Sequence, residues 1–133
     1  MIERDEQRVV QRLRERLPGL RAVYLFGSSA SGESGRDSDV DLAVLLDKPL
    51  TGLRRFDLAG ELADVVGKDV DLVDLRTAST VLRMQVIGKG RRLFGSGADL
   101  EAFEDRVFAD YARLNEERAG ILADVRARGS VYG

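Results

Sequence analysis

The sequence predicts a single α/β domain in which helices flank a small mixed β-sheet and a long helix ends the chain. Apolar runs rich in strand-forming residues alternate with segments of helical periodicity, and Gly or Pro separates them. A length of 133 residues allows one ordinary domain. We therefore expect one domain over residues 1–133, with its core at 20–95 and a helical region at 98–128.

The elements follow in order along the chain. The first helical pattern ends at Pro18-Gly19, the second ends at Gly67, and Ser79 is suited to cap the third. Gly27 to Ser38 holds three Gly and five Ser, so we expect a loop there with one short helical turn. The pattern predicts helices at 3–17, 53–66, 79–87 and 98–128, and strands at 20–26, 39–46, 69–75 and 91–94.

Two helical faces carry specific expectations. In the helix at 53–66, helical spacing assigns one apolar face to the core, made of Phe56, Ala59, Leu62, Ala63 and Val66. The apolar stripe of the last helix runs for roughly 26 residues, about 39 Å at 1.5 Å per residue. One interpretation is a core helix that frays at its end. The other is a docking surface for a partner or a second copy.

Composition excludes several kinds of chemistry. The chain has no Cys and no His, which excludes disulfides, thiolate or imidazole metal sites, and histidine bases. A metal would need oxygen ligands, and a base would most simply be a carboxylate. The net charge of −2 gives no basic field, so we expect no direct nucleic-acid binding. No apolar run suits a signal peptide or a membrane span, so we expect a cytoplasmic protein without membrane contact.

Two short motifs carry the chemistry. Gly27-Ser28 follows the first strand, and Asp39-Val40-Asp41 opens the second ten residues later. Residues two apart on a strand share a face, so Asp39 and Asp41 project side by side and would raise each other's pKa unless a cation lay between them. Gly27 allows a sharp turn, and Ser28 offers a hydroxyl and an N–H to an anion. If the two strands are antiparallel, the motifs meet, which favours a magnesium and phosphate site.

A third carboxylate is expected at the same edge of the sheet. The strand at 39–46, the helix and the strand at 69–75 form a βαβ unit, whose strands should be parallel. Asp71, near the start of its strand, would then lie beside Asp39 and Asp41. Asp69 shares the strand face of Asp71 and remains an alternative, and Asp74 lies nearby.

The segment from Gly27 to Val44 resembles the signature of the polymerase β-like nucleotidyltransferases. The residues that carry the likeness are Gly27-Ser28-Ser29-Ala30-Ser31-Gly32 and Ser38-Asp39-Val40-Asp41-Leu42-Ala43-Val44. Together with the strand Val70-Asp71-Leu72-Val73 and the chain length, they make it most similar to minimal nucleotidyltransferases of the MntA-like antitoxin group. The resemblance covers about residues 20 to 95 and implies the polymerase β-like fold.

The resemblance also implies an activity. Gly27, Ser28 and Ser38 would bind ATP phosphates. Asp39, Asp41 and Asp71 would hold two Mg²⁺ ions, and Asp71 would help deprotonate the acceptor. The enzyme would transfer AMP to a tyrosine of a HEPN-domain toxin and so act as its antitoxin. A complex with that toxin is expected, with a homodimer or hetero-oligomer left open.

The sequence departs from the family at one position and leaves two alternative functions open. Ser31 stands where the family often has Arg, and Arg36 in the same loop could replace that basic contact. A non-catalytic antitoxin would neutralise its HEPN partner by binding alone. Transfer to a small molecule such as an aminoglycoside is disfavoured because the chain lacks a substrate domain.

Overall fold

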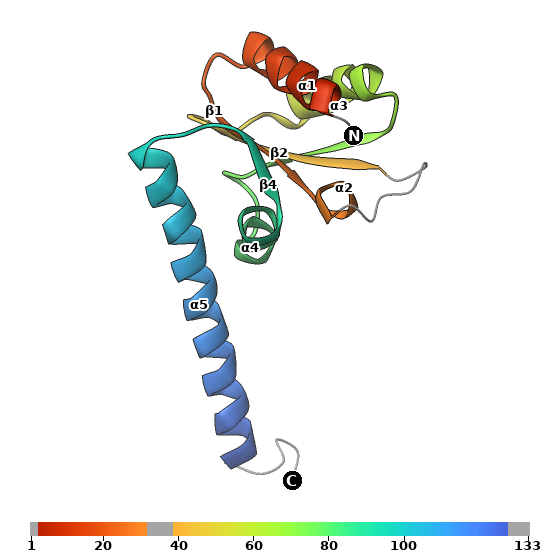
Figure 1. Cartoon of the computed structure of the whole chain (residues 1–133). Coiled ribbons are helices and arrows are strands. Elements are labelled where there is room, and N and C mark those ends of the chain that lie inside the picture. Colours follow the sequence, from red (N-terminus) through yellow and green to blue (C-terminus); the bar gives the residue numbers. More distant parts are fainter. Residues whose placement is uncertain (1–2, 32–38, 128–133) are drawn as a thin grey trace.

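The computed structural model of the chain describes residues 3–31 and 39–127, which form a mixed four-stranded sheet with helices on both faces (Figure 1). The strand order is β3-β2-β1-β4, and the predicted fold class is confirmed. The helices are α1 (Glu3–Arg16), α2 (Ser28–Ser31), α3 (Gly52–Val66), α4 (Thr80–Lys89) and α5 (Ala98–Ala127). The strands are β1 (Leu20–Phe26), β2 (Val40–Leu46), β3 (Val70–Asp74) and β4 (Arg91–Phe94).

Strand β2 has a different orientation relative to each of its two neighbours. It pairs antiparallel with β1, from Leu20↔Leu46 to Phe26↔Asp41. It pairs parallel with β3, from Val40↔Val70 to Val44↔Asp74, and α3 connects the two strands. The parallel pairing was predicted, and the antiparallel pairing meets the condition under which the two motifs come together. As a result, the end of β1 and the starts of β2 and β3 meet at one edge of the sheet.

Helices α1 and α3 cover one face of this sheet (Figure 1). Their apolar side chains pack against alternate residues of the strands, and the cluster includes Val9, Leu13, Val23, Leu25, Leu42, Leu58, Leu62 and Leu72. The prediction for α3 was wrong at Phe56, which is 77% exposed, whereas Leu58 is fully buried. The face that α3 turns to the sheet is thus rotated from the expected one.

Helix α4 and the start of α5 cover the other face. Their buried side chains contact the second set of alternating strand residues, a cluster that includes Ala22, Tyr24, Phe26, Ala43, Leu45, Val86 and Leu100. The ends of α3 and α4 are set by local chemistry. The hydroxyls of Thr51 and Ser79 accept hydrogen bonds from the N–H groups of Arg54 and Leu82, and Gly67 ends α3 in the left-handed conformation.

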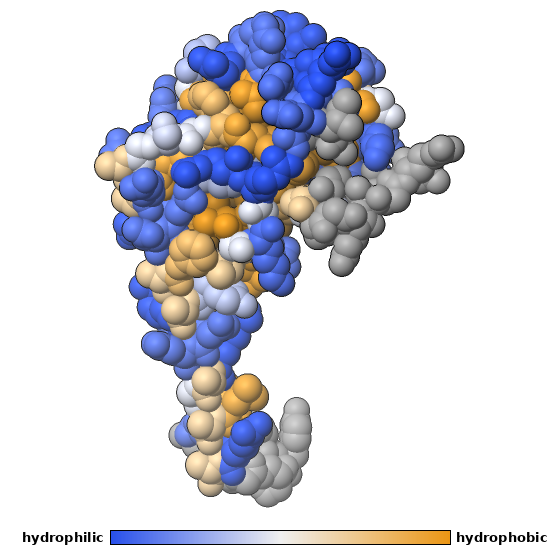
Figure 2. All heavy atoms as spheres, viewed as in Figure 1, coloured by the Kyte–Doolittle hydropathy of each residue, from blue (hydrophilic) through white to orange (hydrophobic). Residues whose placement is uncertain are grey.

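Helix α5 runs well beyond the sheet (Figure 1). Only Leu100 and Val107 of its side chains are buried, both in the first half, so the core-helix interpretation holds for that half alone. The projecting half exposes Ile121, Leu122 and Val125, and Figure 2 shows apolar groups along it. That exposure is what the docking interpretation requires. Among the described residues, no helix is long and apolar enough to cross a membrane.

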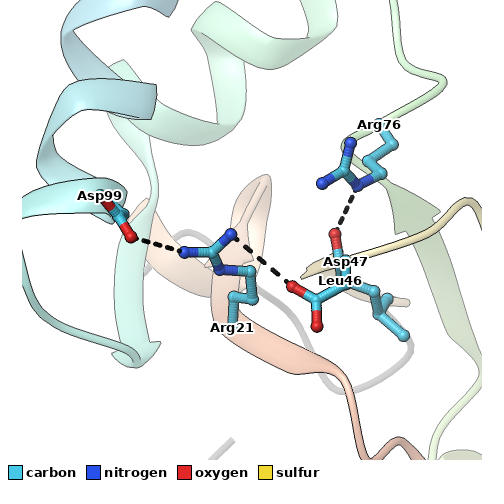
Figure 3. Close-up of polar contacts among 5 residues, drawn as sticks. All are labelled: Arg21, Leu46, Asp47, Arg76 and Asp99. Carbon is cyan, nitrogen blue, oxygen red and sulfur yellow. Dashed lines mark hydrogen bonds and ion pairs between the residues drawn. The ribbon is translucent and has the colours of Figure 1, made fainter.

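Arginine side chains contact residues at the opposite end of the sheet, where β1 begins and β2 and β3 end (Figure 3). The Arg21 guanidinium lies 3.6 Å from the Asp47 carboxylate and 3.4 Å from that of Asp99. Arg76 donates from Nε to the carbonyl of Leu46. This edge therefore carries opposite charges in contact.

The same region contains a buried carboxylate. Asp74, only 4% exposed, accepts hydrogen bonds from the N–H of Leu50 at 2.8 Å and from the N–H of Arg76 at 2.9 Å. A buried charge needs such partners, because an unpaired one is costly. Asp74 therefore fixes the segments that follow β2 and β3.

Replacing Asp74 by Ala should lower the free energy of unfolding by about 3 kcal/mol, because two backbone N–H groups lose their charged acceptor. Urea denaturation followed by circular dichroism measures the change. Asp47→Ala is the matched control, since its exposed ion pair should contribute less than about 1 kcal/mol. Equal losses in the two variants would contradict this role of Asp74.

Candidate active site

The site begins with a turn at the end of β1. Gly27 has φ of +71°, a conformation that favours glycine. A Cβ added there would lie 2.2 Å from Oδ2 of Asp41, so the Gly27 backbone packs directly against that carboxylate. The preceding residue, Phe26, is the antiparallel partner of Asp41. Glycine is therefore required both by the turn and by the close approach of Asp41.

Three carboxylates gather beside this turn. Asp41 and Asp71 are direct partners in the parallel β2–β3 ladder, so their side chains project from the same face of the sheet. Asp39 immediately precedes β2, two residues before Asp41. Asp39 and Asp71 are exposed, whereas Asp41 is half-buried between them and Gly27.

The surroundings of Asp41 in this cluster change its pKa. Burial raises the pKa of Asp41 above its ordinary value, and the neighbouring negative charges of Asp71 and Asp39 raise it further. Both effects disfavour the ionised form of Asp41. A cation near the three carboxylates would oppose both effects, and carboxylate oxygen is the ligand that Mg²⁺ prefers.

The carboxylates do not form a closed metal cluster. Within residues 3–31 and 39–127, no group of three or more ligating side chains stands in an arrangement that could hold a metal ion. Exposed side chains such as Asp39 and Asp71 reorient within picoseconds to nanoseconds. The donor set therefore fits a hard cation in chemistry and in strand position, and its closure would come from side-chain rotation.

The other predicted site residues have different outcomes. Ser28 is half-buried and opens α2, directly after Gly27. Ser38 and Arg36 lie outside the described residues. The backbone carbonyl of Asp69 accepts a hydrogen bond from the N–H of Val40, the residue before Asp41. Asp69 itself lies two residues before Asp71, the ladder partner of Asp41. Asp74 holds the opposite edge of the sheet, so it is not part of this cluster.

One feature beside the site was not predicted. A groove of about 230 Å³ runs between α3 and β3, and Asp71 contributes to its wall together with Arg55 and the exposed Phe56. Because the helical pattern assigned Phe56 to the core, the sequence did not predict this groove. Leu58, which lies four residues before the correctly predicted core residue Leu62, was the signal that could have shown it.

Comparison with known proteins identifies the family. Residues 8–99 match the family described as polymerase beta, nucleotidyltransferase. The chain belongs to this nucleotidyltransferase family. It is 42% identical to a protein adenylyltransferase MntA from Shewanella oneidensis over 127 residues, which cover 96% of this chain and 91% of that protein. The expected resemblance to MntA-like minimal nucleotidyltransferases is confirmed.

Solved structures agree with this assignment. A crystal structure of a toxin–antitoxin with AMP-PNP matches with a TM-score of 0.82 and 43% identity, covering 91% of this chain and 98% of that one. A complex of tri-AMPylated Shewanella oneidensis HEPN toxin with MNT antitoxin matches with a TM-score of 0.79 and 40% identity. That match covers 95% of this chain and 99% of the solved chain.

Asp41→Asn should make the cation-free protein more stable at neutral pH. The raised pKa of Asp41 means that the folded state holds this proton more tightly than the unfolded state. Stability is then fully present below the ordinary aspartate pKa and is lost as the pH rises through the raised value. Asparagine removes that loss, so the advantage of the variant should grow from acid to neutral pH.

Thermal melting in a chelator measures this difference, and melting with Mg²⁺ provides the complementary test. Mg²⁺ should raise the Tm of the native chain, because it binds the folded state alone. It should raise the Tm of Asp41→Asn much less. A native chain more stable than the variant at neutral pH in the chelator would contradict the strain ascribed to Asp41.

Proposed function

We propose that this nucleotidyltransferase transfers AMP from ATP to a hydroxyl, expected to be that of a tyrosine, on a HEPN-domain toxin and thereby acts as its antitoxin. The observation that carries the proposal is the pairing of Asp41 with Asp71 beside Gly27, in a chain 42% identical to a protein adenylyltransferase. The solved complexes of related antitoxins, one with AMP-PNP and one with an AMPylated HEPN toxin, support the donor and the acceptor. Because ATP is the donor, the proposal includes a cytoplasmic location.

Asp39, Asp41 and Asp71 are the residues that would hold Mg²⁺, with two ions expected. When bound, the ions would neutralise the charge that develops on the attacking and leaving oxygens. The support for this donor set is the raised pKa of Asp41, which burial and its two acidic neighbours cause and which no basic residue in the described part of the chain offsets. An all-oxygen set also agrees with a chain that has no His and no Cys.

Gly27, Ser28 and Ser38 would bind the phosphates of ATP. Gly27 lets the backbone pass close to Asp41, so a phosphate chain held at this turn would lie next to the carboxylates. The hydroxyl and the N–H of Ser28 supply polar contacts at the same turn.

The transfer step forms a bond from the acceptor oxygen to the α-phosphorus and breaks the α–β anhydride bond, and pyrophosphate leaves. The hydroxyl proton goes to a carboxylate, because the sequence contains no histidine to receive it. Asp71 is our candidate for this base. It is exposed, it stands at the outer strand of the cluster, and it borders the groove beside α3.

Asp39→Ala and Asp41→Ala should each reduce AMP transfer more than about a hundredfold, because each removes a direct metal ligand and outer-sphere changes alone cost up to that much. The assay incubates the purified chain with Mg²⁺, α-labelled ATP and the HEPN partner, and counts label on the partner. Asp47→Ala is the matched control at the opposite sheet edge and should keep the native rate. Full labelling by either site variant would overturn the proposed function.

Asp71→Asn should abolish transfer, whereas Asp69→Asn should keep most of the native rate. The reason is register, because Asp71 is the direct ladder partner of Asp41, whereas Asp69 lies two residues earlier, just before β3 begins. Both variants remove one exposed carboxylate from the same strand face, so they control for each other. The reverse result would make Asp69 the third carboxylate.

A non-catalytic antitoxin remains the second candidate function, and the projecting half of α5 favours it. Ile121 and Leu122 there are 64% and 57% exposed, which is the kind of surface that binds a protein partner. Co-expression with the toxin separates the two functions. If binding alone neutralises the toxin, cells with Asp39→Ala should grow as well as cells with the native antitoxin. If transfer is required, they should not.

A further inference from the structure

Strand β3 is an outermost strand of the sheet, so it has a neighbouring strand on one side only. Its outer side, called the β3 edge below, leaves backbone groups unpaired. The carbonyl of Asp69 accepts from Val40, and the N–H of Leu75 donates to the carbonyl of Val44. In a parallel ladder, alternate residues of a strand bond to the neighbour. Residues 69, 71, 73 and 75 therefore face β2, and the N–H and C=O groups of Val70 and Leu72 face the free edge.

This edge lacks three of the features that can block pairing with another chain, namely a bulge, a proline and a lysine. The β2–β3 ladder is regular from 40↔70 to 44↔74, and β3 contains neither Pro nor Lys. The other edge of the sheet differs, because β4 carries Arg91 and Arg92 in ion pairs with Glu6 and Glu104. Of the two edges, β3 is the one open to an added strand.

An apolar surface lies next to the open edge. The groove between β3 and α3 is lined by Arg55, Phe56 and Ala59 from α3 and by Val70, Asp71 and Leu72 from β3. Phe56 and the neighbouring Leu53 are 77% and 75% exposed, although both are large apolar residues. Arg55 adds a positive charge that would favour an acidic residue in the bound segment.

The two faces of β3 belong to different surfaces. Asp71 projects with Asp41 into the candidate active site, whereas Val70 and Leu72 project to the face covered by α3. A strand added beside β3 would alternate in the same way. Its residue beside Asp71 would lie on the active-site face, and the residues directly before and after it would lie toward Phe56.

We infer that the β3 edge and this groove seat the acceptor as an extended segment. The segment carries a hydroxyl residue beside Asp71 and an apolar residue directly before or after it against Phe56. The inference rests on the proposed function, and it adds the acceptor's conformation and the sequence class that the enzyme selects. Continuity of the groove with Asp71 is the reason to assign it to the acceptor and not to another partner.

Residue-resolved amide hydrogen exchange tests the pairing without relying on activity. The native chain is measured alone and with the purified HEPN partner, without ATP. The amides of Val70 and Leu72 should exchange at least tenfold more slowly in the complex. Those of Asp71 and Val73, which already bond to β2, should change little. Protection elsewhere in the chain with none at Val70 and Leu72 would overturn the inference, and so would concentration-dependent protection in the isolated chain, which indicates a second copy at this edge.

Variants test the same surface through kinetics. Val70→Pro removes an N–H that faces the free edge, and Val70→Thr keeps it. Phe56→Glu removes the apolar contact, and Phe56→Leu keeps it. The first member of each pair should raise the KM for the HEPN partner at least tenfold with the Kd for ATP unchanged, and the second should stay near native. The Tm should be unchanged in Phe56→Glu, because that side chain is exposed, whereas Val70 packs partly against the core.

An unchanged KM in both Val70→Pro and Phe56→Glu would overturn the docking inference while leaving the proposed function in place. The proposed function fails by a different result, which is labelling by Asp39→Ala at the native rate. The two failures are therefore separate observations in one assay.

Discussion

Burial of Asp41 beside two other carboxylates is the constraint that shapes one end of the sheet, because burial and these neighbouring charges both raise its pKa. Strand β2 runs antiparallel to β1 and parallel to β3, so the end of β1 and the starts of β2 and β3 meet. Asp39, Asp41 and Asp71 consequently lie near one another, and no basic side chain within residues 3–31 and 39–127 lowers the pKa of Asp41. Such a cluster costs stability, and it persists because the strands that carry it are fixed elsewhere.

The opposite edge shows how the strands are fixed. There, carboxylates and guanidinium groups are matched, as in Arg21 with Asp47 and Asp99, and the buried Asp74 is satisfied by backbone N–H groups. Both faces of the sheet are packed by apolar clusters from four helices. The fold thus separates a stabilising edge from a strained one, which is the arrangement expected where binding a ligand relieves the strain.

The sequence predicted the parts of this structure that depend on local pattern. The strands at 20–26 and 91–94 were located to the residue, because apolar runs between Gly or Pro leave little choice of boundary. The parallel pairing of β2 with β3 followed from chain connectivity and brought Asp41 and Asp71 together, whereas the antiparallel pairing of β1 with β2 was the condition for the two motifs to meet. The predicted catalytic, metal-binding and phosphate-binding roles of the site residues are untested, and Ser38 lies outside the described residues.

The prediction was wrong where tertiary packing, and not the local sequence pattern, determines which side of a helix is buried. Helix α3 offers two overlapping apolar faces that share Leu62, one with Phe56 and one with Leu58, and periodicity alone does not decide which meets the sheet. By contrast, the position of Asp71 beside Asp41 was predicted. The buried position of Asp74, whose carboxylate accepts hydrogen bonds from the N–H groups of Leu50 and Arg76, was not.

Strand β3 connects these observations, because one short element carries the candidate catalytic residue Asp71, packs against the core and forms the proposed recognition edge. Its odd positions bond to β2 and carry Asp71 on the active-site face, and its even positions fill the core beneath α3. The backbone of those even positions still faces outward, next to an aromatic side chain that the core does not use. An acceptor paired to this edge would be aligned by the same ladder geometry that places Asp71 beside Asp41. Its hydroxyl position would then be set by the sheet itself, which is more rigid than a loop.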